Sequence, residues 1–218
     1  IEINNPGEDT QTSIMAIRAL GIKIKKIRSS YIIFGLGIGY PKNKKKLIIN
    51  CRNSGTTLRL LTPLIAGSKV KAKIIGDRSL SSRPYRLSFL NKFLMNVNPT
   101  NKEYLPLNIN GHTNCIQNKI RITKPSAQMI SAATLAGIMS FGETIIKAPN
   151  NVRDHTSRLL KYLKYKVKFQ KKKNTQIIKI LGRQFLKPLK NYKIPSDPSS
   201  SACLISIAIL TKGSEVKI

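Results

Sequence analysis

The sequence predicts an α/β fold built from repeated β-α-β-α-β-β units, and two observations support that prediction. First, Ser-containing segments that lead into an apolar stretch recur at Ser54, Ser126 and Ser199-Ser200, at nearly constant intervals of roughly 70 residues. Second, short alternating apolar runs take turns with longer stretches whose apolar residues recur every three to four positions. Helices and strands that repeat in this order pack as layers around one shared core.

The first 50 residues match only the back half of such a unit, which is one helix followed by two strands. Apolar periodicity predicts the helix over residues 13–21. Strands are expected around residues 22–24 and 31–34, where β-branched and aromatic residues gather. We therefore treat residues 1–50 as a partial unit.

Residues 51–120 form the first full unit. A helix is predicted from Ser54 through the apolar stretch 58–67, followed by a strand over 70–75. An Asp next to an Arg, at Asp77-Arg78, then precedes a second, amphipathic helix. The apolar positions of that helix are Leu87, Leu90, Phe93 and Leu94. An alternating strand over 105–109 closes the unit before Asn110-Gly111.

Residues 121–190 repeat the same series. Here the helix is predicted from Ser126 through 129–137, the next strand over 143–147, and the Asp–Arg pair is Arg153-Asp154. The second helix carries Leu159, Leu160 and Leu163, and the closing strand covers 177–181 before Gly182. Residues 191–218, with Ser199-Ser200 leading into the apolar run 202–210, are predicted to open a further unit.

The charge of the chain is strongly positive, with 39 Lys and Arg against 9 Asp and Glu and a formal net charge of +30. Such a surplus usually indicates a nucleic-acid partner. Here it is mostly Lys and comes with abundant Asn and Ile, and all three residues share A/T-rich codons. The basic clusters at 42–46 and 171–173 lack the interleaved aromatic residues on which bases stack. We therefore expect no nucleic-acid partner and keep a basic nucleic-acid-binding protein as an alternative.

Other classes of protein fit the sequence poorly. The longest apolar runs fall short of the ~18 residues that a membrane span needs, so no membrane association is expected. No secretory signal is visible in the first five residues. Cys51, Cys115 and Cys203 are odd in number and far apart, which indicates reduced thiols in a cytoplasmic protein. With two His and no clustered carboxylates, no metal site is expected.

The helix starts are the candidate functional sites. A Ser, Thr or Gly there leaves backbone N–H groups free at the positive end of the helix dipole, and this arrangement suits a phosphate or a carboxylate. For a single Ser, ordinary capping is the better explanation. The repeat, however, places these starts at equivalent positions. Arg59, Arg83 and Arg153 lie near them, and Arg binds phosphate and carboxylate in a bidentate manner.

Five segments in the same order resemble motifs of one enzyme family, the synthases of 5-enolpyruvylshikimate 3-phosphate. N-S-G-T-T-L-R at 53–59 resembles N-[AS]-G-T-x-x-R, and G-D-R-S-L-S-S-R-P at 76–84 resembles G-D-x-S-L-x-x-R-P. S-A-Q at 126–128 resembles S-[SA]-Q, and R-D-H-T at 153–156 matches R-D-H-T. D-P-S-S-S-A at 197–202 resembles D-[PA]-S-S-[AS]-A. Together the motifs span nearly the whole chain.

The resemblance implies the enolpyruvyl transferase fold, an inside-out α/β barrel domain made of three such repeats. It also implies a reaction, the transfer of the enolpyruvyl group of phosphoenolpyruvate to the 5-hydroxyl of shikimate 3-phosphate. Residues 1–190 would form a substrate-binding domain, and residues 191–218 would begin the return into a second domain. No cofactor or metal is implied, and the complete protein would be a cytoplasmic monomer of aromatic amino-acid biosynthesis.

Site residues follow from the resemblance position by position. Shikimate 3-phosphate would contact Ser126, Ala127, Gln128 and Arg153. Phosphoenolpyruvate would contact Asn53, Gly55, Thr56, Arg83 and Gln128. At Gly55 the absence of a side chain would let the backbone approach the small substrate closely.

The family's acid and base residues have no counterpart in this sequence, so we expect no catalytic residue in the chain and no turnover by the chain alone. The chain would then be a fragment of a longer enzyme. Two alternatives share the fold, a UDP-N-acetylglucosamine enolpyruvyl transferase and a catalytically inactive anion-binding module.

Overall fold

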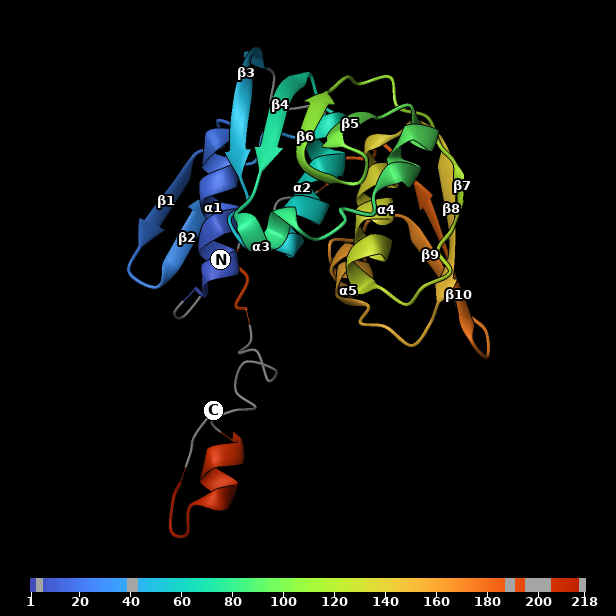
Figure 1. Ribbon diagram of the computed structural model, residues 1–218. Helices are drawn as coiled ribbons and strands as arrows, with labels where there is room; N and C mark the ends of the chain where they lie inside the picture. The colour runs from blue at the N-terminus through green and yellow to red at the C-terminus, as the bar shows by residue number, and fades with distance from the viewer. Residues whose placement is uncertain (3–5, 39–42, 187–190, 195–204, 216–218) are drawn as a thin grey trace.

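The computed structural model describes residues 1–2, 6–38, 43–186, 191–194 and 205–215. In chain order its elements are α1 (Glu8–Ala19), β1 (Ile24–Ile27), β2 (Ser30–Ile33), β3 (Asn43–Asn50), α2 (Gly55–Ala66), β4 (Val70–Ile75), α3 (Arg78–Ser81), η1 (Ser88–Phe93), β5 (Asn96–Asn101), β6 (Tyr104–Asn110), β7 (Lys119–Arg121), α4 (Ala127–Met139), β8 (Glu143–Pro149), α5 (His155–Tyr162), β9 (Val167–Lys171) and β10 (Thr175–Leu181). Residues 205–210 are also helical and lie apart from the rest of the fold (Figure 1). Within the described ranges, no helix combines the length and apolarity that crossing a membrane requires.

Two four-stranded sheets have the same topology. Their strand orders are β3-β4-β6-β5 and β7-β8-β10-β9, so each sheet places its fourth strand between its second and third. In both sheets the first two strands pair in parallel and the other neighbours pair antiparallel. The predicted α/β class with repeated β-α-β-α-β-β units is therefore confirmed.

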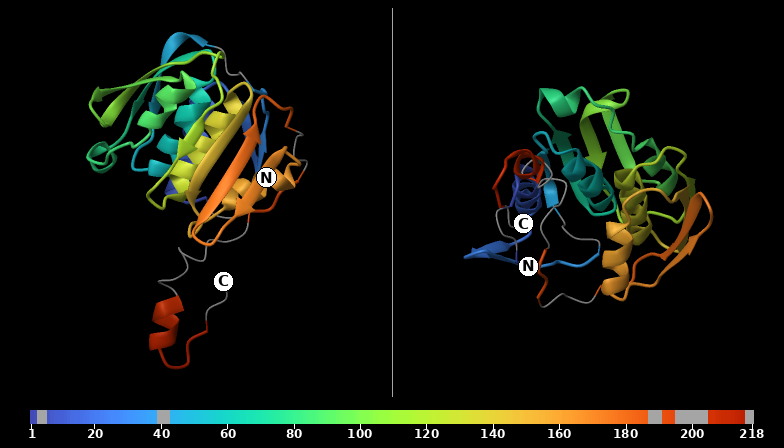
Figure 2. Two further views of the ribbon diagram at one scale, coloured as in Figure 1. Left: turned by 90° about the vertical axis from the view of Figure 1, so that its right-hand side faces the viewer. Right: turned by 90° about the horizontal axis from the view of Figure 1, so that it is seen from below.

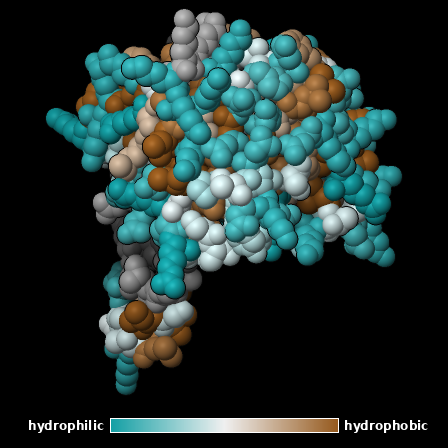
Figure 3. All heavy atoms as spheres, turned by 45° about the horizontal axis from the view of Figure 1, so that its top comes forward, coloured by the Kyte–Doolittle hydropathy of each residue, from teal (hydrophilic) through white to brown (hydrophobic). Residues whose placement is uncertain are grey.

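The helices α2 and α4 lie inside the fold with the two four-stranded sheets facing outward, and α1 packs beside α2 and β3 with one face exposed (Figures 1 and 2). Helix α2 packs on β4 and β6, α4 packs on β8 and β10, and the two helices pack on each other. Apolar side chains of both layers, such as Leu58 and Ile65 on α2 and Ile146 on β8, are fully buried between them. Hydrophilic side chains cover most of the outer face seen in Figure 3.

A glycine closes each full unit where the last strand meets the end of the first helix. A Cβ at Gly111 would lie 2.3 Å from the Ser68 carbonyl oxygen, and one at Gly182 would lie 1.8 Å from the Ser140 carbonyl oxygen. Both distances are far below van der Waals contact, so only glycine fits at these equivalent positions. The two units therefore share a close packing contact as well as a topology.

The partial unit has the predicted elements with shifted bounds. Helix α1 begins at Glu8, five residues before the predicted start, because Gly7 takes the capping position and the first turn carries Glu8 and Asp9. Acidic residues there are favoured by the helix dipole. Strand β1 begins two residues after its predicted start, and β2 begins one residue before its predicted start.

Residues from the two ends of the chain extend this partial unit. Glu2 pairs antiparallel with Ser30 of β2 and parallel with Lys193. The backbone N–H of Glu2 donates to the Tyr192 carbonyl oxygen at 2.9 Å, and that of Ile194 donates to the Glu2 carbonyl oxygen at 3.1 Å. The strand order here is residues 192–194, Glu2, β2 and β1. It matches the two complete sheets, in which the fourth strand of the unit lies between the second and the third.

The predicted second helix of the first full unit is wrong in kind. Its place is taken by the one-turn helix α3 and the 3₁₀ helix η1. Pro84 separates them, since a proline disfavours helical geometry in the residue before it. Leu94 ends η1 with a left-handed φ of 60° and is 54% exposed, whereas the other three predicted apolar positions are buried.

The remaining predicted elements agree more closely. Strand β4 has the predicted bounds, β6 and β10 contain the predicted runs, and β8 extends two residues beyond its run. Helix α5 buries Leu160 but leaves Leu159 at 39% exposure. The predicted third helix start at Ser199-Ser200 and the motif at 197–202 lie outside the described residues.

Candidate anion-binding site at the paired helix starts

The paired helix starts, residues 53–56 before and at the beginning of α2 and residues 126–128 at the beginning of α4, lie on the same side of the fold. Strand β3 leads directly into the first start. The Ser54 Oγ accepts a hydrogen bond from the Thr57 backbone N–H at 3.1 Å and from the Thr57 hydroxyl at 2.9 Å. Ser54 is also 1% exposed, so its side chain serves as the helix cap, whereas its neighbours Gly55 and Thr56 are half-buried.

Arg83 reaches the first helix start from the segment after α3. Its Nη2 donates to the Asn53 Oδ1 at 3.0 Å and to the Ser79 Oγ at 2.6 Å. An open depression of about 530 Å³ is lined by Asp77, Arg78, Ser79 and Ser82 on the same segment. Two of the residues predicted for phosphoenolpyruvate, Asn53 and Arg83, are therefore in contact, with the exposed guanidinium oriented by two neutral acceptors.

The second helix start is joined to the first by Gln128. Ser126 caps α4 by accepting from the Met129 backbone N–H at 3.4 Å. The Gln128 Nε2 donates to the Thr56 Oγ1 at 3.0 Å, and its Oε1 accepts from the Arg59 Nη1 at 3.1 Å. Residues that are 72 positions apart in sequence thus lie within one hydrogen bond of each other. Ser126, Ala127 and Gln128 are all half-buried.

Arg59 contacts three segments at this junction. Besides Gln128, its guanidinium donates to the Gly55 carbonyl oxygen at 3.3 Å and to the Pro84 carbonyl oxygen at 3.1 Å. Burial lowers the pKa of Arg59, and the positive charges of Arg86 and Arg83 lower it further. Although Arg59 was noted in the sequence as a neighbour of the helix start, its contact with Gln128 could not be anticipated.

Arg86 is a basic residue that sequence reasoning missed. It lies three residues after Arg83, has a left-handed φ of 56°, and is close enough to Arg59 to affect its pKa. Its position two residues after the Arg83-Pro84 dipeptide is the feature of the sequence that could have identified it as part of the site. Arg59, Arg83 and Arg86 form a cluster of positive charge, and both ion pairs within the described residues lie elsewhere, at Asp154.

Arg153 and Asp154 lie just before α5. Arg153 is exposed, and the segment is positioned beside α4 by a hydrogen bond of 2.7 Å between the Thr156 and Ser131 hydroxyls. Asp154 occupies the N-cap position of α5 but makes no capping hydrogen bond with its side chain, because its Oδ1 accepts from the Arg158 Nε at 2.7 Å and its Oδ2 lies 3.8 Å from the Lys171 Nζ. Asp77 does cap, since its Oδ1 accepts from the Leu80 backbone N–H at 2.7 Å.

Nucleophilic and metal chemistry find little support at this site. Burial raises the pKa of the Cys51 thiol, which precedes the first helix start, to about 12, so it stays protonated at neutral pH. Over the parts of the chain that the structure describes, no group of three or more His, Cys, Asp or Glu residues could hold a metal ion. The arrangement can bind and orient anions through N–H groups, hydroxyls and guanidinium groups.

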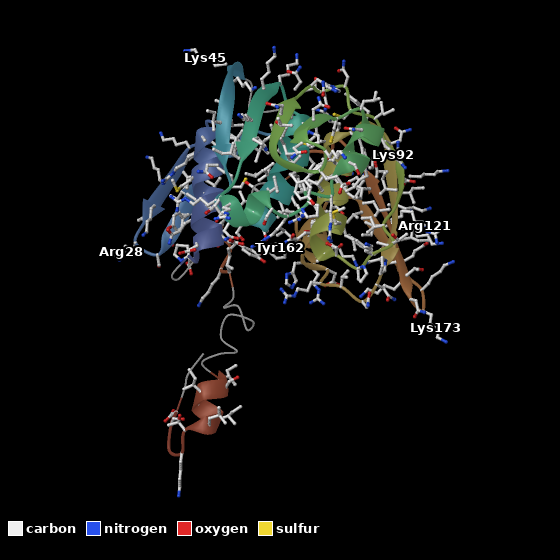
Figure 4. All side chains as sticks on the ribbon, viewed as in Figure 1. Arg28, Lys45, Lys92, Arg121, Tyr162 and Lys173 are labelled. Carbon is white, nitrogen blue, oxygen red and sulfur yellow. The ribbon has the colours of Figure 1, made fainter. Side chains whose placement is uncertain are left out.

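Positive charge elsewhere is spread over many elements. Side chains from the β1–β2 turn, β3, η1, β7 and the β9–β10 turn all point into solvent (Figure 4). The labelled examples are Arg28, Lys45, Lys92, Arg121 and Lys173. The absence of a nucleic-acid partner stays a prediction.

The fold is an α/β repeat domain in which two helix starts lie side by side and are joined by hydrogen bonds. A family model described as EPSP synthase (3-phosphoshikimate 1-carboxyvinyltransferase) matches residues 2–218. The chain therefore belongs to the EPSP synthase family.

Individual relatives agree. The chain is 34% identical over 211 residues to a 3-phosphoshikimate 1-carboxyvinyltransferase of Clostridium tetani, covering 95% of this chain and 46% of the relative. It is 32% identical over 215 residues to the 3-phosphoshikimate 1-carboxyvinyltransferase of Paracoccus denitrificans, covering 97% of this chain and 48% of that relative. The solved EPSP synthase from Acinetobacter baumannii superposes with a TM-score of 0.81 at 31% identity, covering 96% of this chain and 47% of that one. The chain thus spans about half the length of these relatives.

Proposed function

We propose that this chain is the substrate-binding part of an enzyme that transfers the enolpyruvyl group of phosphoenolpyruvate to the 5-hydroxyl of shikimate 3-phosphate, releasing phosphate. The observation that carries the proposal is the position of Gln128, whose amide contacts Thr56 and Arg59 of the other helix start. One side chain can therefore face two ligands bound side by side. Membership in the EPSP synthase family supports phosphoenolpyruvate and shikimate 3-phosphate as those ligands.

The two substrates divide the site. Phosphoenolpyruvate would bind at Asn53, Gly55, Thr56 and Arg83, and shikimate 3-phosphate at Ser126, Ala127 and Arg153, with Gln128 between them. Two multiply charged anions repel each other, and fixed guanidinium and N–H groups offset that repulsion while holding the hydroxyl near the enol carbon. The proton donor and the base would come from the part of the family's length that this chain does not span.

In this proposal residues 1–190 form the substrate-binding domain, with a partial unit at 1–50 and full units at 51–120 and 121–190. Residues 191–218 lead toward a second domain. The complete protein would act as a cytoplasmic monomer without a cofactor.

Isothermal titration of the 218-residue chain tests the proposal. We expect shikimate 3-phosphate to bind at one site, and phosphoenolpyruvate to bind more weakly to the isolated chain. UDP-N-acetylglucosamine is the control ligand, because the paralogous transferase would use it. Heat from UDP-N-acetylglucosamine, with none from shikimate 3-phosphate, would overturn the substrate assignment.

A further inference from the structure

We propose that Arg59 is a positioning residue that sets the orientation of the Gln128 carboxamide and so presents one of its N–H groups to the substrates. This inference rests on the proposed function for the identity of the ligands, but its structural part concerns the ligand-free site. Arg59 itself need not touch a substrate.

The chemistry of the three side chains decides the orientation. A carboxamide has an oxygen that accepts and an NH₂ group that donates, and the two ends have nearly the same shape. The Thr56 hydroxyl can accept or donate, so by itself it would tolerate either end of Gln128. A guanidinium group can only donate, so the group 3.1 Å from the Arg59 Nη1 must be the amide oxygen. Arg59 therefore directs the NH₂ group toward Thr56 at 3.0 Å, with its second N–H left to bind a ligand.

The partial burial of the Arg59 guanidinium is unfavourable for the stability of the fold. Its guanidinium is half-buried and donates to three neutral oxygens, those of Gln128, Gly55 and Pro84. Within the described residues, no ion pair involves Arg59. Burying a cation beside neutral acceptors and other cations destabilises a fold relative to an apolar residue of similar volume. A need for a group that can only donate hydrogen bonds, placed where α2, α4 and the segment after α3 meet, explains why Arg59 is kept in this position.

Gly55 has a second role in this arrangement. A Cβ at this position would lie 2.6 Å from the Arg59 Nη1, the same atom that binds Gln128. The nearest atom after that, a methyl group of Leu80, would be 3.8 Å away. Because the guanidinium is the movable end of a flexible side chain, it would give way and release the amide. The missing side chain thus makes room for Arg59 as well as for a ligand.

The test uses the side-chain amide signals of Gln128 in ¹⁵N–¹H spectra of the ligand-free 218-residue chain, assigned by their loss in Gln128→Leu. In Arg59→Met we expect both Gln128 N–H signals to shift and their order parameter to fall. The Kd for shikimate 3-phosphate should rise roughly tenfold to a hundredfold, as for the loss of a hydrogen bond with a charged partner. Gly55→Ala should shift the same signals in the same direction by a smaller amount.

Arg18→Met is the matched control. Arg18 also donates to a backbone oxygen, that of Ile24 at 3.0 Å, but it is exposed and lies on α1. Its loss should lower the melting temperature while leaving the Gln128 signals in place and the Kd within roughly twofold. If Arg59→Met lowers the melting temperature and leaves the Gln128 signals unchanged, as the control does, Arg59 only packs and the inference is overturned.

Arg59→Lys keeps the test decisive if Arg59→Met fails to fold. An ammonium group still donates but cannot reach three acceptors in the planar geometry of a guanidinium. If the ammonium group keeps a hydrogen bond to the amide oxygen, we expect the Gln128 signals to shift less in Arg59→Lys than in Gly55→Ala or Arg59→Met. Unchanged Gln128 signals in both Arg59→Lys and Gly55→Ala would refute the positioning role. Shifted signals without any binding of shikimate 3-phosphate by the unsubstituted chain would support the positioning role and defeat the proposed function alone.

Discussion

The two full units, β3 to β6 and β7 to β10, have one topology and two different helix starts. Both sheets have the same order, and both units close on a glycine against helix carbonyl groups. The first start carries Gly55 and Thr56 with Arg59 and Arg83 bound around it. The second start consists of Ser126, Ala127 and Gln128. Near it, the Asp154 carboxylate forms ion pairs and does not cap a helix. A repeated backbone thus places two helix starts at equivalent positions, and their side chains differ; under the proposed function these side chains distinguish the two ligands.

The most severe test of this equivalence concerns the closing glycines. Gly111→Ala and Gly182→Ala should each destabilise the fold by about 3 kcal/mol or more, because the new methyl group would overlap backbone oxygens that cannot move freely. Urea denaturation measures the loss. Gly35→Ala is the control, since nothing lies within 4 Å of its Cβ, and it should have little effect. A large loss at only one of the two glycines would show that the units are not equivalent.

The arginines test the division of ligands between the starts. Arg83→Ala should weaken phosphoenolpyruvate binding by about 2 kcal/mol, the size of a charge-assisted hydrogen bond, and shikimate 3-phosphate binding by much less. Arg153→Ala should show the opposite preference. Calorimetry of both variants with both ligands measures the four changes. Equal losses for the two ligands in either variant would mean that the starts do not divide the substrates.

The capping serines should differ because they differ in burial. Ser54→Ala removes a buried hydroxyl that accepts two hydrogen bonds, so we expect a loss of about 1–2 kcal/mol. Ser126→Ala removes one longer bond at a half-buried site and should cost about 0.5–1 kcal/mol. Thermal unfolding gives the comparison. The reverse ranking would mean that Ser126 is the better-formed cap.

The smallest difference is expected at the equivalent aspartates. Asp77→Asn keeps a capping oxygen and should change stability little, whereas Asp77→Ala should cost about 1 kcal/mol. Asp154→Ala breaks partly exposed ion pairs and should cost about 0.5 kcal/mol or less. Added salt should erase the effect at Asp154 and leave that at Asp77. A salt-independent loss at Asp154 would indicate a role outside the ion pairs.

Predictions from the sequence were most successful where the signal is local. Strand β4 and the runs within β6 and β10 follow from two-residue alternation, which every strand with one buried face must show. The second helix of the first unit was mispredicted because its apolar spacing fits a helix, while Pro84 and the left-handed Leu94 limit it to two short turns. Apolar spacing shows which side chains are buried, but it does not show that the backbone between them is continuous.

The helix starts show the same division between local and tertiary information. By itself the sequence determined the repeat, the capping residues Ser54 and Ser126, and the ordered motifs that identify the family, because these depend on residue type and spacing along the chain. Only the tertiary structure decided that Thr56, Arg59 and Gln128 meet, that Ser54 is occupied as a cap, and that Asp154 pairs with cations. Such contacts join residues of different units, and their geometry is set by how α2 and α4 pack in the shared core.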